Sequence, residues 1–319
     1  MNLLVLYHST HILASGAHKG AGIPLPATPG CAMMVPTGRP VKRGGAREEN
    51  VNTYIYETHL HTAQASACSD TPGREYVRRY IDAGYSGIIV TDHFRRGNCA
   101  VDRGLPWREF VCRFCEGYED ALDEGIKLNF PVFFGWEETY GGDDYLVYGL
   151  DKQWLLEHPE VARWSRKEQF DEVHRYGGCV VQAHPFRAAW YIRTIHLAPD
   201  LVDAVEGFNA GNQMAWNILG MRYARLRGLP VTAGSDNHHA YGMRPDSLAG
   251  VALDRPLECI GDYVNVIRQG LPLRPVIPVS VPEWTEDVLP ERPVEWLDAD
   301  ERPVARDTVE ALRRGFNRT

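Results

Sequence analysis

The sequence contains no apolar run that approaches the roughly 20 residues needed to span a membrane. The chain has fewer basic than acidic residues, with 34 Lys and Arg and 42 Asp and Glu. The resulting net charge of −8 gives no general attraction to nucleic acid or to anionic membranes. The seven cysteines are odd in number and lack the spacing of a disulfide framework. These absences favour a protein of the reducing cytoplasm that has neither nucleic acid nor a membrane as its partner.

The two ends of the chain differ in composition from its middle. Residues 1–50 hold seven Gly and five Pro, one aromatic residue and no sustained periodicity. No basic residue precedes the short apolar stretch at the start, so a disordered extension is expected rather than a signal peptide. Residues 276–319 are predicted to form an irregular C-terminal segment, with a hairpin near "DADERP" and a short amphipathic helix within "ARDTVEALRRGFNR".

The middle of the chain, residues 52–275, alternates between short β-branched runs and helix-like stretches. The strand-like runs are Gly87–Val90, Val132–Phe134, Tyr145–Tyr148, Cys179–Val181, Val202–Val205 and Val231–Thr232. Between them, "PGREYVRRYIDAG" begins with Pro and ends with Gly, as helices tend to. The stretch "PWREFVCRFCEGYEDALDEG" repeats large apolar residues every four positions, which also indicates a helix. Repeated strand–helix units predict a mostly parallel sheet, either open or closed into a barrel.

Carboxylates and imidazoles follow these strand-like runs at their C-terminal ends. The side chains concerned are His59 and His61, Asp92 and His93, Glu137 and Glu138, His184, Glu206, and Asp236 and His238. In a barrel the C-terminal ends of the strands converge on one face, which is where active sites are found. Neutral imidazoles and anionic carboxylates are ligands that hold Zn, Mn or Fe. The sequence therefore predicts a divalent-metal site with more ligands than one ion needs.

The chain contains five short motifs, which appear along the sequence in the order "HLHT", "TDHF", "GWE", "AHPF" and "GSDNH". In this order and spacing the chain resembles the PHP (polymerase and histidinol phosphatase) family of metal-dependent phosphoesterases. The resemblance implies a distorted (β/α)7 barrel with two or three metals at one face. The implied ligands of the first metal are His59, His61, Glu137 and Asp236. Glu137 would bridge to a second metal that His184 also binds, while His93 and His238 would hold a third.

The chain departs from this family pattern at two positions. Members with three metals place a further His or Asp a few residues after the H-x-H pair, where this chain offers Gln64, Cys68 or Asp70. They also carry a His near the strand that reads "DDYLVYG" here, where Asp144 is the nearest substitute. We therefore expect one tightly bound metal (Zn, Mn or Fe), a second beside it, and a third that is weak or absent.

Three arginines are candidates for binding a phosphate. Arg187 lies three residues after His184, and Arg95 and Arg96 follow "TDHF" in the same way. A guanidinium can hold two phosphate oxygens at once, although all three residues could equally be solvated loop arginines. Divalent metals lower the pKa of bound water and stabilise charge on the transferring group, so no Ser or Cys nucleophile is needed. We expect catalytic roles for Glu137, Asp236 and Arg187, with Asp236 or water protonating the leaving group.

Other candidate features have simpler interpretations. The CxxC at residues 112–115 lacks a second pair and falls in a helix-like stretch, so helix packing is expected there. His158, His174 and His196 lie outside the strand ends and are expected at the surface. Glu138 should point away from the metal if its strand stays extended.

The predicted function is hydrolysis of a small phosphorylated metabolite, such as histidinol phosphate, a nucleotide or a sugar phosphate. Two alternatives remain open at this point. One is a metal-dependent hydrolase of C–N or C–O bonds, and the other is a non-catalytic metal-binding module.

Overall fold

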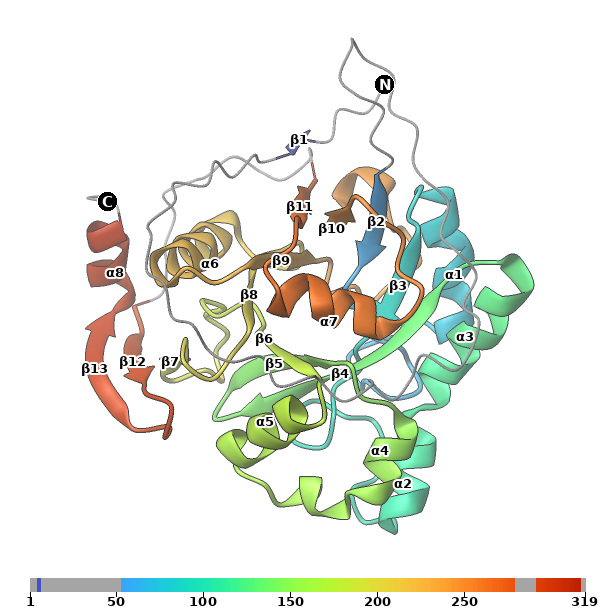
Figure 1. Cartoon of the computed structure of the whole chain (residues 1–319), viewed down its shortest axis with the longest axis horizontal. Coiled ribbons are helices and arrows are strands. Elements are labelled where there is room, and N and C mark those ends of the chain that lie inside the picture. Colours follow the sequence, from blue (N-terminus) through green and yellow to red (C-terminus); the bar gives the residue numbers. More distant parts are fainter. Residues whose placement is uncertain (1–4, 7–52, 279–290, 317–319) are drawn as a thin grey trace.

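The computed structural model describes residues 5–6, 53–278 and 291–316 (Figure 1). Among these residues ten strands form the main sheet. In spatial order the strands are β1 (Val5–Leu6), β11 (Arg274–Ile277), β10 (Gly250–Leu253), β2 (Tyr54–Glu57), β3 (Gly87–Val90), β4 (Val132–Tyr140), β5 (Asp143–Tyr148), β6 (Cys179–Gln182), β8 (Ala204–Asn209) and β9 (Val231–Gly234). Most of the expected extension, residues 1–50, lies outside the described residues, and the division of the chain at residues 50 and 276 stays a prediction.

The sheet curves into a nearly closed barrel. Strands β2, β3 and β4 pair in parallel, and so do β6, β8 and β9. A parallel bridge between Leu60 and Asn237 joins the residues that follow β2 and β9. The predicted barrel is therefore confirmed. The expectation of a mostly parallel sheet holds only for these strands, because β5 is antiparallel to both β4 and β6, and β10 is antiparallel to β2.

Helices pack against the barrel and against one another. They are α1 (Gly73–Asp82), α2 (Trp107–Phe114), α3 (Glu116–Leu128), α4 (Lys152–Glu157), α5 (Arg166–Arg175), α6 (Met214–Arg227), α7 (Ile260–Arg268) and α8 (Val309–Phe316), with short 3₁₀ helices at Pro159–Ala162 and Pro245–Ser247. Local sequence sets their ends. Ser165 and Glu168 form a capping box at the start of α5, and Gly228 ends α6 in the left-handed conformation. The stretch predicted as one helix breaks at Cys115 into α2 and α3.

Alternation along each strand separates an inner from an outer core. Tyr56, Ile89, Phe133 and Leu146 are buried in one cluster inside the barrel. Their strand neighbours, such as Ile88, pack outward against the helices. The apolar face of α7, which lies in front of the ring of strands in Figure 1, joins the inner cluster. The same period of two places Glu137 on the inner face of β4, with Phe133, and Glu138 on the outer face.

The C-terminal residues form a small second sheet beside α6 (Figure 1). Strand β12 (Pro293–Leu297) pairs with β13 (Pro303–Thr308) in a hairpin and with β7 (Ile195–Leu197) in parallel. Val309 and Leu312 of α8 pack in the same buried cluster as Leu219 and Tyr223 of α6. Within the described ranges, no helix is both long and apolar enough to cross a membrane.

Candidate metal centre

Five side chains meet where the barrel strands end. His59 and His61 follow β2, Glu137 is in β4, His184 follows β6 and Asp236 follows β9. His59 Nε2 lies 3.3 Å from Glu137 Oε1, and His184 Nε2 lies 3.2 Å from the same oxygen. His61 Nε2 lies 3.1 Å from Asp236 Oδ1 and 3.5 Å from Glu137 Oε2. All five residues are buried, so the structure brings together five of the seven predicted metal ligands in one dry cluster.

Several buried polar atoms of this cluster and of the adjacent His93 form no hydrogen bond of good geometry among the described residues, although opposite charges lie close to them. They are the Nε2 atoms of His59 and His61, Nδ1 of His93 and Oε2 of Glu137. Buried polar atoms are normally satisfied, so a group of such atoms on converging side chains fits the binding of a cation. Ligand atoms of His59, His61 and Glu137 lie within 4.8 Å of one another, and so do those of Glu137, Asp144 and His184. These donor sets fit divalent metals.

The His59 imidazole is oriented by a buried carboxylate. Its Nδ1 lies 3.0 Å from Glu206 Oε1, and the other Glu206 oxygen accepts hydrogen bonds from the His184 backbone N–H and the Asn209 amide. A proton on Nδ1 leaves the Nε2 lone pair facing the cluster, as in a carboxylate–histidine–metal arrangement. Burial lowers the pKa of His59, but Glu206, Asp236 and Glu137 together raise it well above its usual range. The pocket thus favours a positive charge at this position.

A second support holds His61. Its Nδ1 lies 3.2 Å from Ser66 Oγ, which donates a 2.7 Å hydrogen bond to Asp92. Asp92 also accepts hydrogen bonds from the backbone N–H and the hydroxyl of Thr62. Burial raises the pKa of Asp92 to about 6, although these hydrogen bonds act to lower it. Asp92 thereby fixes the H-x-H loop.

Glu57 ties the ends of β2 and β9 together beneath the cluster. Its Oε1 accepts hydrogen bonds at 2.9 Å from the backbone N–H groups of Thr58, His59 and Ser235, and its Oε2 accepts one from the Tyr80 hydroxyl. Burial raises the pKa of Glu57 to about 7. Glu57 is not among the site residues predicted from the sequence, although a carboxylate at the end of the apolar run before "HLH" is a possible signal.

Backbone conformation is unusual at two of the converging residues. His184 has φ = 29° and Asp236 has φ = 52°, both in the left-handed region that favours glycine. Residues held in such conformations cost on the order of 1–3 kcal/mol and cluster at functional sites. Neither residue is Gly, although glycine would adopt this backbone conformation without strain. The imidazole of His184 and the carboxylate of Asp236 therefore have a use at these positions that outweighs the strain.

The predicted phosphate-binding arginines divide into two groups. The Arg187 guanidinium lies beside the cluster, where Nη2 contacts Asp236 Oδ2 and Nε donates a 2.9 Å hydrogen bond to Asn212. Arg96 instead pairs with Glu138 at 2.8 Å on the outer face of β4 and donates to the Trp164 carbonyl. Arg95 donates to the Arg103 carbonyl and lies over the Phe110 ring. The contacts of Arg95 and Arg96 therefore lie away from the cluster.

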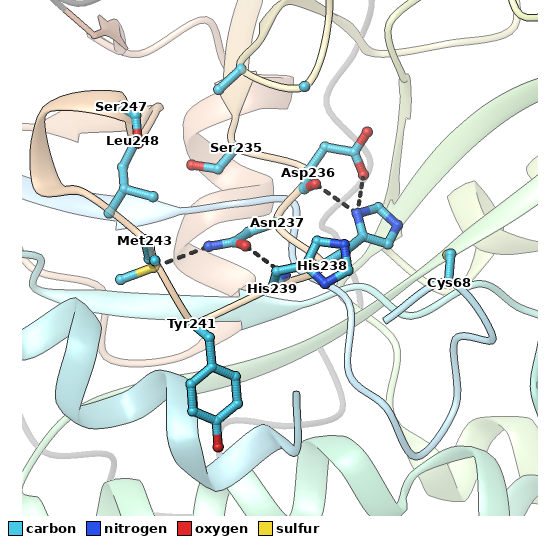
Figure 2. Close-up of a pocket in the computed structure, with 13 residues that line it drawn as sticks. Cys68, Ser235, Asp236, Asn237, His238, His239, Tyr241, Met243, Ser247 and Leu248 are labelled. Carbon is cyan, nitrogen blue, oxygen red and sulfur yellow. Dashed lines mark hydrogen bonds and ion pairs between the residues drawn. The ribbon is translucent and has the colours of Figure 1, made fainter. Parts of the chain in front are cut away.

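His93 and His238 lie next to the five converging residues. Both rings stack on His61 with centroid separations of 4.3 Å, and His93 Nδ1 is 2.7 Å from Glu137 Oε2. His238 and Asp236 also line an open pocket of about 540 Å³, shown in Figure 2 with Cys68 at its edge. A pocket of this size suits a small metabolite.

Three other histidines have structural roles. The prediction that His158 lies at the surface is wrong: it is buried, stacks on Trp154 and bonds to the Trp154 carbonyl at 2.7 Å. His174 is partly exposed and pairs with Asp203, and His196 pairs with a buried aspartate of β5. The two thiols of the CxxC are free and lie at the end of α2.

The chain is similar to several known proteins. No family model matches the chain. A probable histidinol-phosphatase of Deinococcus radiodurans is 26% identical over 235 residues, which cover 58% of this chain and 87% of that protein. A two-domain protein of Bacteroides vulgatus, containing a predicted PHP-like metal-dependent phosphoesterase, superposes with a TM-score of 0.52 at 13% identity, covering 82% of this chain and 70% of the other. A putative metal-dependent phosphoesterase of Bifidobacterium adolescentis gives a TM-score of 0.42 at 15% identity, covering 57% of this chain and 87% of the other.

The chain therefore has the fold of the PHP-like metal-dependent phosphoesterases, and the resemblance seen in its five motifs is confirmed. The proteins to which it is similar are metal-dependent phosphoesterases or hydrolases, and its clusters of His and carboxylate ligands are of the kind that holds metal ions.

Proposed function

We propose that this chain is a metal-dependent phosphoesterase that hydrolyses a small phosphomonoester. The observation that carries the proposal is the convergence of His59, His61, Glu137 and Asp236, with buried ligand atoms that have no hydrogen-bond partner among the described residues. Such a set would hold one divalent metal of the Zn, Mn or Fe type. Glu137, His184 and Asp144 would hold a second, with Asp144 supplying the ligand for which the family uses a histidine.

The chain's own residues would position these metals and the substrate. Glu206 and Ser66 hold the two imidazoles of the H-x-H pair in the tautomers that leave Nε2 free. When bound, divalent metals would acidify water and stabilise the charge of the transferring phosphoryl group. Arg187 lies where it can bind the phosphate, because its guanidinium contacts Asp236 at the edge of the ligand cluster. Asp236, or water, would supply the proton for the leaving group.

Two considerations favour a phosphate ester over a C–N or C–O bond. A phosphate monoester carries two negative charges that need cations, and the partly exposed Arg187 adds a fixed cation beside the metal ligands. The similarity to a probable histidinol-phosphatase makes histidinol phosphate one candidate substrate among small metabolites. The pocket of about 540 Å³ also suits a ligand of that size.

The test is turnover together with metal analysis. Protein purified without added metal should carry at least one bound divalent ion and should hydrolyse members of a panel of phosphomonoesters, with inhibition by inorganic phosphate. His59→Ala and His61→Ala should each lose most of the metal and nearly all activity, because each removes a proposed ligand. His174→Ala, a partly exposed histidine on α5, should lose neither. Hydrolysis of amides without any phosphatase activity would favour the C–N hydrolase, and equal metal content in all three variants would contradict the ligand assignment.

A further inference from the structure

The loop that follows His184 places two aromatic side chains in solvent. Trp190 is 89% exposed and Tyr191 is 50% exposed. Apolar rings gain free energy when they leave water, so a neighbouring pair in solvent is costly unless something covers it. Among the described Phe, Tyr and Trp residues, only Tyr241 is exposed as well, and it lines the pocket beside Asp236 (Figure 2). The exposed rings of the described chain thus lie in segments that follow strands β6 and β9.

The same loop begins at the metal centre. His184 is a proposed ligand, and the backbone N–H of Arg187 donates a 2.9 Å hydrogen bond to its carbonyl. The Arg187 guanidinium contacts Asp236. Trp190 comes three residues later, and three residues of fully extended chain span at most about 10 Å. A phosphate bound by Arg187 would therefore have the Trp190–Tyr191 pair close to its leaving group.

The backbone on both sides of the two rings is held in place. Phe186 before them and Ile192 after them are buried in one apolar cluster. The Ile192 N–H donates to the Ala189 carbonyl at 3.1 Å, which closes a turn with the two aromatic residues in its middle. The Ile192 carbonyl accepts a 2.9 Å hydrogen bond from Arg292 Nε, and a Cβ added to Gly142 in the β4–β5 turn would lie 3.8 Å from Ile192. The exposure of the rings is therefore set by a turn that is anchored at both ends.

The Tyr191 hydroxyl lies within electrostatic range of the centre. Burial and the carboxylates of Asp144, Glu137 and Asp236 raise the pKa of Tyr191, while the Arg187 guanidinium acts to lower it. These four charged groups belong to the proposed metal and phosphate sites. The turn is thus placed beside the reacting end of the pocket.

The two rings meet at a right angle. Their centroids are 5.7 Å apart and their planes are inclined at 87°. A planar group that lies on the face of one ring would meet the edge of the other, and both contacts are favoured between aromatic rings. We infer that Trp190 and Tyr191 form a subsite for a planar aromatic ring carried by the leaving group of the phosphomonoester, such as a nucleobase or an imidazole. The inference rests on the proposed function, because it names the class of ester that is hydrolysed.

Matched pairs of substrates test the subsite, because the members of each pair differ in the ring alone. Adenosine 5′-monophosphate is compared with ribose 5-phosphate, and histidinol phosphate with 2-aminopropyl phosphate. The readout is the ratio of kcat/KM with the ring to kcat/KM without it, measured on metal-loaded full-length protein. A variant that loses metal or stability lowers both values together, so the ratio reports contact with the ring. Wild type should favour the ring by about 10-fold or more in at least one pair.

Trp190→Ala and Tyr191→Ala should each lower this ratio by about 5- to 10-fold, because each removes one stacking partner. Trp190→Phe should keep most of the ratio, whereas Trp190→Leu should lose it, since leucine is apolar but has no aromatic face. Ile126→Ala is the control. Ile126 is 58% exposed on α3, so its removal also deletes an exposed apolar side chain and should leave the ratio at the wild-type value.

The outcomes separate this inference from the proposed function. Equal kcat/KM for the two members of both pairs in wild type would overturn the inference, and so would a wild-type ratio in either alanine variant. In both cases hydrolysis of the esters without a ring would leave the proposed function standing. A protein that hydrolyses no phosphomonoester would contradict the proposed function and the inference together. A ratio that falls for the adenosine pair alone would identify a nucleobase as the ring, and one that falls for the histidinol pair alone would identify an imidazole.

Discussion

At the scale of single residues, some side chains orient the proposed metal ligands, and one is proposed to bind the substrate. His59 reaches the cluster through Nε2 because Glu206 occupies its Nδ1, and His61 does so because Ser66 and Asp92 occupy its own. The Arg187 guanidinium is held by hydrogen bonds to the side chains of Asn212 and Asn209. Its guanidinium contacts a proposed metal ligand, Asp236, so a bound phosphate would compete with that carboxylate for the same cation.

The role of Arg187 can be separated from metal binding by mutation. Arg187→Ala should leave metal content unchanged and lower kcat/KM by about 10²-fold or more, since a charge-assisted contact in a partly dry site is worth roughly 2–4 kcal/mol. Arg187→Lys should recover only part of that loss, because an ammonium cannot make a planar two-point contact. The measurements are steady-state kinetics and metal analysis on both variants. Wild-type turnover by Arg187→Ala would show that the metals alone hold the phosphate.

The buried Glu57 should leave a pH signature on stability. Its pKa is about 7 in the folded protein against 4.5 ordinarily, because burial disfavours the charged form. The folded state therefore holds the proton over a window in which the unfolded state has released it, so stability falls as pH rises from about 4.5 to 7. Between about pH 5 and pH 8 the wild type should lose roughly 2–3 kcal/mol relative to Glu57→Gln. Denaturant unfolding of both proteins across this range is the measurement, and parallel pH profiles would refute the prediction.

Elements position these side chains through close packing. Helix α3 approaches the H-x-H loop at Gly117, where an added Cβ would lie 1.9 Å from the Thr62 hydroxyl and 3.2 Å from Asp92. Thr62 donates two hydrogen bonds to Asp92, which in turn supports Ser66. The glycine thus permits a helix to lie directly against the second support of the metal centre.

Gly117→Ala should disturb this contact. We expect a loss of about 1–3 kcal/mol of unfolding free energy from overpacking, together with weaker metal binding, because Thr62 must move. Gly315→Ala in α8 is the matched control, since a Cβ there meets nothing within 4 Å. That change should be neutral or stabilise by up to about 1 kcal/mol through helix propensity. Thermal unfolding and metal titration compare the two variants. Equal effects would show that Gly117 is not needed for the close approach of α3 to Thr62.

At the scale of the whole molecule the centre links segments that are far apart in sequence. His59 and Asp236 lie on opposite sides of the seam closed by the bridge between Leu60 and Asn237. A metal held by both would join β2 to β9 and close the barrel more firmly.

Chelation should therefore lower the stability of the whole barrel. A ligand bound only to the folded state stabilises it by about 2.7 kcal/mol at 100 times its dissociation constant. We expect removal of metal to lower Tm by several degrees and its return to restore Tm, with a smaller change in His59→Ala, which has lost a proposed ligand. Calorimetry before and after chelation is the measurement. An unchanged Tm in wild type would mean that the ligands are preorganised without metal and that the barrel closes independently of it.

The sequence by itself determined the repeating units, the curved sheet and the residues that gather at its strand ends. Strand β3 was predicted residue for residue, because a continuous apolar run bounded by Gly and a polar turn is a local pattern. The alternation along β4 separated Glu137 from Glu138 correctly, since side chains alternate at every residue of a strand.

Only the tertiary structure decided what those residues contact. The burial of His158 depends on packing against Tyr176, which lies 18 residues further along the chain and whose hydroxyl contacts the imidazole. Arg96 and Arg187 follow their histidine motifs at equal spacing, yet one pairs with Glu138 on the outer face of the barrel and the other with Asp236 at the ends of the strands. The spacing between histidine and arginine is the same in both motifs. The two arginines meet different partners because the two loops leave the sheet at different places.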